Sequence, residues 1–124
     1  MPTSSTDNEI EKLEVEHARM LEEKEANDLE IAKIKAQLLE ARAQVWSSGE
    51  YADPDWLRRA TFAAKQRGQR SQQLQRCIGE SGRRIRKLYA TRFERCFVEA
   101  ARATLDASTF ERVWASAQQL STHR

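Results

Sequence analysis

The chain has 124 residues, with 21 Lys and Arg against 19 Asp and Glu, for a net charge of +2. Hydrophobic residues make up 40% and charged residues 32%, and only four glycines and two prolines can interrupt helices. This composition argues against a sheet-rich fold and favours long helices. No apolar run approaches the roughly 20 residues that span a bilayer. We therefore predict an all-α protein: a long antiparallel helical hairpin, or coiled coil, with a short C-terminal helix.

The length allows one domain, which we place at residues 9–120 between flexible tails at residues 1–8 and 121–124. Met1–Asn8 has neither the basic start nor the apolar run of a signal peptide, so we expect a cytoplasmic protein.

The first predicted helix spans residues 9–47 and carries apolar positions that alternate in steps of three and four, which indicates a coiled coil. The stripe comprises Ile10, Leu13, His17, Met20, Lys24, Asn27, Ile31, Ile34, Leu38, Ala41 and Val45. Lys24 and Asn27 interrupt it, and polar residues at such positions can fix register and partner number.

A turn is predicted at residues 48–53, followed by a helix over residues 54–105 that Asp53 caps and Pro54 begins. Its apolar stripe continues without a change of phase through Gly79 and Gly82. We predict one helix, which can kink at residues 79–82. The alternative is a break into two helices there.

A last helix is predicted over residues 108–120, because Ser108 and Glu111 form a capping-box pattern. Its apolar face carries Phe110 and Trp114, which we expect to pack with Phe93 and Phe97 in a small C-terminal core.

Charge is divided along the chain. Acidic residues dominate from Asp7 to Glu30, and basic residues dominate from Arg58 to Arg102. The basic face can pair with the acidic first helix, since a hairpin brings their outer ends together, or it can bind the phosphates of a nucleic acid. The candidate polyanion-binding residues are Arg76, Arg83, Arg84, Lys87 and Arg95.

Three large aromatic residues, Trp46, Tyr51 and Trp56, surround the predicted turn. They either form a knot that fixes the hairpin or serve as exposed anchors for a protein partner, because Trp and Tyr are common at interface hot spots.

The sequence predicts no catalytic residue, no cofactor site and no metal site, and hence no enzyme. His17 and His123 lack partners at catalytic or metal-ligand spacing. We expect Cys77 and Cys96 to be reduced thiols, with Cys96 inert on the apolar face.

The segments Asp53–Ala60, Lys65–Gln69, Gln73–Arg76 and Phe93–Arg102 resemble small helical proteins encoded by phages and prophages of proteobacteria. The resemblance covers about residues 53–116. It implies an accessory role in which the protein binds and inhibits, or adapts, a host or defence component.

Together these patterns lead us to expect a non-enzymatic, self-associating protein-binding module, with a dimer favoured and no membrane partner. The alternative is a nucleic-acid-binding protein that uses the basic face of the second helix.

Overall fold

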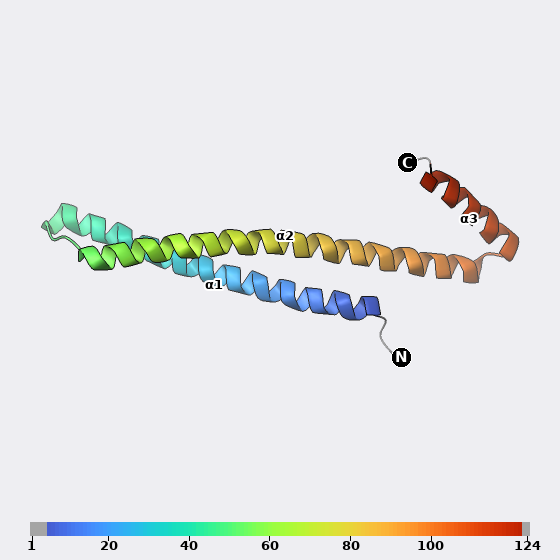
Figure 1. Ribbon diagram of the computed structural model, residues 1–124, viewed down its shortest axis with the longest axis horizontal. Coiled ribbons are helices and arrows are strands. Elements are labelled where there is room, and N and C mark those ends of the chain that lie inside the picture. The colour runs from blue at the N-terminus through green and yellow to red at the C-terminus, as the bar shows by residue number, and fades with distance from the viewer. Residues whose placement is uncertain (1–4, 123–124) are drawn as a thin grey trace. The chain divides into compact units, whose positions relative to one another are not determined.

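The computed structural model describes residues 5–122, which form three helices: α1 (Ser5–Ser48), α2 (Pro54–Thr104) and α3 (Ala107–Thr122). The predicted all-α class is confirmed: two long antiparallel helices form a hairpin, and a short helix follows (Figure 1). Contacts divide the chain into two compact units, Met1–Ile85 and Arg86–Arg124, whereas the sequence predicted one domain over residues 9–120. No helix within residues 5–122 is long and apolar enough to cross a membrane.

The helix ends differ slightly from the predicted ones. α1 begins at Ser5, so residues 5–8 are helical rather than part of a tail, and α3 continues to Thr122. The rest of the predicted tails, residues 1–4 and 123–124 with His123, lies outside the described residues. α2 continues through Gly79 and Gly82, so the alternative of a break into two helices is wrong.

The turn between α1 and α2 follows from its capping residues. Gly49 has a φ of 72°, a left-handed conformation that glycine adopts without steric cost, and its N–H donates to the Val45 carbonyl at 3.1 Å. Asp53 then caps α2, because its Oδ1 accepts from the Asp55 N–H at 3.0 Å. Pro54 occupies the first helical position, where its missing N–H removes no hydrogen bond.

The predicted stripe on α1 is the seam that α2 covers. All of its members are buried or half-buried, whereas most other residues of α1 are exposed. Ile10 and Leu74 are the most enclosed apolar side chains, with 3% and 2% of their surface exposed, and each contributes about 1.5–3 kcal/mol by burial. On α2 the covered stripe ends at Ile85, the last residue of the first unit.

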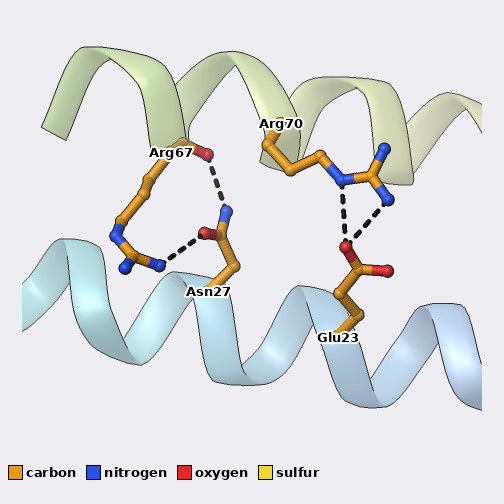
Figure 2. Close-up of polar contacts among 4 residues, drawn as sticks. All are labelled: Glu23, Asn27, Arg67 and Arg70. Atoms are coloured by element: carbon orange, nitrogen blue, oxygen red, sulfur yellow. Dashed lines mark hydrogen bonds and ion pairs between the residues drawn. The ribbon is translucent and has the colours of Figure 1, made fainter. Parts of the chain in front are cut away.

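Polar contacts across the seam set the register of the two helices (Figure 2). The amide nitrogen of Asn27 donates to the Arg67 carbonyl at 2.6 Å, and Nη1 of Arg67 donates to the Asn27 side-chain oxygen at 3.3 Å. One turn earlier in α1, Glu23 Oε1 accepts two hydrogen bonds from Arg70, at 2.8 and 3.0 Å. Of the two pairs, the one that lies earlier in α1 (Glu23) has its partner later in α2 (Arg70), as an antiparallel hairpin requires.

Two further links extend this register. Asp28 accepts a hydrogen bond from the Ser71 hydroxyl at 2.6 Å and pairs with Lys24 at 2.7 Å. The hydrogen bonds from Lys24 and Ser71 hold the pKa of Asp28 below its usual value. Near the start of α1, Glu9 pairs with Arg84 at 2.7 Å. The acidic start of α1 therefore does lie beside part of the basic stretch of α2.

In the second unit, Asp106 rather than the predicted Ser108 caps α3. Its carboxylate accepts from the Ser108 hydroxyl at 2.9 Å and from the Thr109 N–H at 3.3 Å. The Asp106 carbonyl accepts the first helical hydrogen bond, from the Phe110 N–H at 2.9 Å. Hydrogen bonds from Thr109 and Ser108 lower the pKa of Asp106. The helix starts one residue early because a carboxylate at this position reaches the third helical N–H.

Candidate functional site

The second unit contains an open apolar groove between the end of α2 and α3. Its volume is about 330 Å³, and apart from Glu94 every lining residue is apolar. The lining residues are Phe93, Glu94, Phe97, Val98, Ala101, Phe110, Val113, Trp114 and Ala117. On each helix the successive lining residues are one or three positions apart, so each helix contributes one continuous face. Leu105 and Asp106 connect α2 to α3, and residues from the two helices line the groove together.

The groove is exposed, which corrects the prediction of a small C-terminal core. Phe93 is 69% exposed and Phe97 62% exposed, and Trp114 is still 44% exposed. Two short helical faces meet along one line only, so they leave the outer halves of these rings uncovered. Covering the exposed surface of these rings with another apolar surface would be favourable by roughly 25 cal/mol per Å² of apolar area.

The aromatic rings of the groove are ordered in pairs along each helix. Phe93 and Phe97 stack with their centroids 6.4 Å apart, and Phe110 and Trp114 stack at 6.0 Å. The guanidinium of Arg102 lies 5.0 Å from the centre of the Phe110 ring, at cation–π distance. The groove therefore has two ordered pairs of aromatic rings, and the positive charge of Arg102 lies over the Phe110 ring.

The turn aromatics lie in the first unit and do not form a knot. Trp46 is 91% exposed and Tyr51 83% exposed, and only Trp56 is half-buried. The structure thus leaves the rings of Trp46 and Tyr51 exposed to solvent.

The candidate polyanion-binding residues are all exposed, but they are not equivalent. Arg84 is engaged by Glu9 at 2.7 Å. Arg76 and Arg83 make no ion pair within residues 5–122, and neither do Lys87 and Arg95 in the second unit. Acidic neighbours therefore neutralise only part of the basic stretch.

The interior of the hairpin offers little chemistry. Within the described part of the chain, no three His, Cys, Asp or Glu side chains come together as metal ligands would. His17 is half-buried in the seam, as predicted. Among residues 5–122, neither its Nδ1 nor the buried hydroxyl of Ser81 finds a hydrogen-bond partner.

Both cysteines are free thiols, and both are exposed. For Cys96 this contradicts the prediction of an inert position on the apolar face. Cys96 lies on the apolar stripe of α2, and the members of that stripe beyond Ile85 are exposed. A residue with the helical spacing of the seam is therefore at the surface here.

Sequence reasoning identified the four large rings of the groove and the apolar face of the last helix, which also carries Val113 and Ala117, but it missed the smaller lining residues of α2. Val98 and Ala101 line the groove without standing out in composition. The available signal was the pairing of two aromatic residues four apart on each side of Asp106. No family model matches the chain, and comparisons with curated proteins and with solved structures found no significant similarity.

Proposed function

We propose that the chain is a non-enzymatic protein-binding module whose main binding surface is the apolar groove between α2 and α3. The observation that carries the proposal is the exposure of Phe93, Phe97 and Trp114 around one preformed groove. Large aromatic side chains that a partner can desolvate dominate the energetics of protein interfaces. An apolar groove between two helices suits an apolar segment of a partner protein, in the manner of helix-in-groove recognition.

Trp46 near the end of α1 and Tyr51 in the turn after it are two further exposed aromatic residues, which support the same proposal. Within the proposal the protein self-associates and acts in the cytoplasm. The resemblance of residues 53–116 to phage-encoded helical proteins extends it to an accessory role, with a host or defence protein as the partner that is inhibited or adapted.

The second candidate function is nucleic-acid binding, which the exposed and unneutralised Arg76 and Arg83 favour. Contacts to phosphates alone would give affinity without sequence specificity. With six or more such contacts, affinity would fall by about 10³ or more between 50 and 200 mM salt.

Capture of partners from a nuclease-treated bacterial lysate by the tagged chain tests the proposal. The groove variant Phe97→Ala/Trp114→Ala should lose a partner that the wild type retains, because it removes two aromatic anchors. Phe62→Ala is the matched control: Phe62 and Phe97 are equally exposed, at 62%, but Phe62 lies on the first unit. This control should keep the partner.

Equal capture by the groove variant would contradict the groove as the binding surface. If every partner disappears with nuclease, and Arg76→Glu/Arg83→Glu abolishes the shift of a labelled duplex, the nucleic-acid function replaces the proposed one.

A further inference from the structure

The C-terminal half of α1 carries a second apolar stripe, outside the seam. This outer stripe consists of Leu29, Ala32, Ala36, Leu39, Ala43 and Trp46. Its members follow the three-and-four spacing of a coiled-coil face, and all are exposed. Leu29 is 59%, Leu39 68% and Trp46 91% exposed, so α2 covers none of the large members.

The outer stripe lies roughly 150° around α1 from the seam residues Ile34 and Leu38, since each residue advances about 100°. This is the face of a hairpin helix that is ordinarily polar. Toward the N-terminus the same phase reaches Glu25 and Glu22, so the apolar run has a definite end. A continuous apolar face on an exposed helix marks an interaction surface.

We propose that the outer stripe binds the outer stripe of a second copy of this chain, antiparallel, around a two-fold axis at Ala36. The inference rests on the self-association within the proposed function and gives it a specific interface, distinct from the groove.

The sizes of the side chains complement one another in this arrangement. The two-fold axis sets Leu29 of each copy against Ala43 of the other, and Ala36 meets itself, while Leu39 is level with position 33 and packs beside the neighbouring Ala32. Large side chains then interdigitate with small ones, as a packed core requires. A parallel pairing would instead place Leu39 against Leu39 and alanine against alanine, leaving alternating collisions and gaps.

The charges along one edge of the stripe are also self-complementary. Lys33 and Glu40 lie on the same edge, seven residues apart, on either side of the axis. An isologous interface makes every contact twice, so Lys33 of each copy lies beside Glu40 of the other. Both are exposed, and in the single chain Lys33 forms an ion pair with Glu30 at 3.3 Å. On the other edge Lys35 lies near Lys35 of the other copy, and this repulsion is expected to make the dimer weak and reversible.

Sedimentation equilibrium of the full chain, from about 1 to 100 µM, tests the inference. A Kd on the order of 10 µM would show monomer at one end of that range and mostly dimer at the other. Ala36→Glu should shift the chain to monomer, because two carboxylates would meet at the axis. Ala18→Glu is the matched control: Ala18 shares the phase of the stripe but lies beyond Glu22, so this variant should still dimerise.

The charge pair tests the direction of pairing. Lys33→Glu should weaken the dimer, and Lys33→Glu/Glu40→Lys should restore it. Circular dichroism on each variant checks that the hairpin is intact, which is expected because every substituted residue is exposed.

A wild-type chain that stays monomeric at about 100 µM, or a dimer that survives Ala36→Glu, would overturn the inference. Failure of the double charge exchange to restore the dimer would overturn the antiparallel arrangement. A monomer that still captures its partner through Phe97 and Trp114 would leave the proposed function standing.

Discussion

Asn27 has the most specific environment of any polar residue between Ser5 and Thr122, because it is the polar side chain in that range that the fold buries, at 8% exposure. Its amide both donates to and accepts from Arg67, so its buried polar atoms are satisfied. An apolar residue would fit the seam in several registers, whereas these two hydrogen bonds exist in one. Asn27 therefore gives the hairpin its alignment at some cost in apolar burial.

Asp28 should make the stability of the hairpin sensitive to acid. Hydrogen bonds from Lys24 and Ser71 lower the folded-state pKa of Asp28 below the 3.8 of an ordinary aspartate, so folding favours the carboxylate. The contribution is complete above the unfolded-state pKa and is lost as pH falls through the lower folded-state pKa. Urea unfolding of the wild type and of Asp28→Asn should show a stability difference at neutral pH that shrinks as the pH falls below the ordinary aspartate value. A difference that stays constant or grows in acid would contradict this role.

At the scale of the elements, Gly49 at the end of α1 and Gly68 within α2 have different backbone conformations. Gly49 ends α1 with a φ of 72°, whereas Gly68 is helical and a Cβ added there would meet no atom within 4 Å. The first position requires glycine, and the second only tolerates it.

Alanine substitutions at these two glycines should therefore change stability in opposite directions. Gly49→Ala should lower the free energy of unfolding by about 1–2 kcal/mol, the cost of the left-handed conformation for a residue with a Cβ. Gly68→Ala should raise it by up to about 1 kcal/mol, because alanine is the better helix former. Urea unfolding of both variants measures this, and two changes of the same sign would show that the turn is not built as described.

The sequence predicted these elements well where periodicity and capping acted locally. The three-and-four spacing identified the seam of α1 residue by residue, and Asp53 and Pro54 placed the start of α2. The cap of α3 was misplaced, because Asp106 and Ser108 are both good capping residues and only the hydrogen bonds distinguish them.

At the scale of the whole molecule, the candidate site was harder to predict because apolar phase does not reveal what covers a face. The apolar stripe of α2 continues past Ile85 with the same helical spacing. Glu9, which pairs with Arg84, is already close to the start of α1 at Ser5, so little of α1 remains to cover that part of the stripe. Positions such as Phe93 and Cys96 therefore read as core in the sequence and are surface in the structure.

The same reasoning separates the two functions considered for the molecule. The basic stretch is partly used inside the hairpin, where Arg70 and Arg84 pair with Glu23 and Glu9. Each exposed pair contributes only about 0.2–1 kcal/mol, so these contacts align the helices more than they stabilise them. The aromatic residues of the groove make no such ion pairs. The free energy of burying their exposed surface is released when a partner covers it.

Amide hydrogen exchange of the chain, alone and in complex with its captured partner, tests the central claim most directly. A partner seated in the groove should slow exchange in residues 93–104 and in α3 and leave residues 58–83 unchanged, because a bound segment excludes water and suppresses local opening. Protection confined to residues 58–83 would contradict the account and assign binding to the basic face.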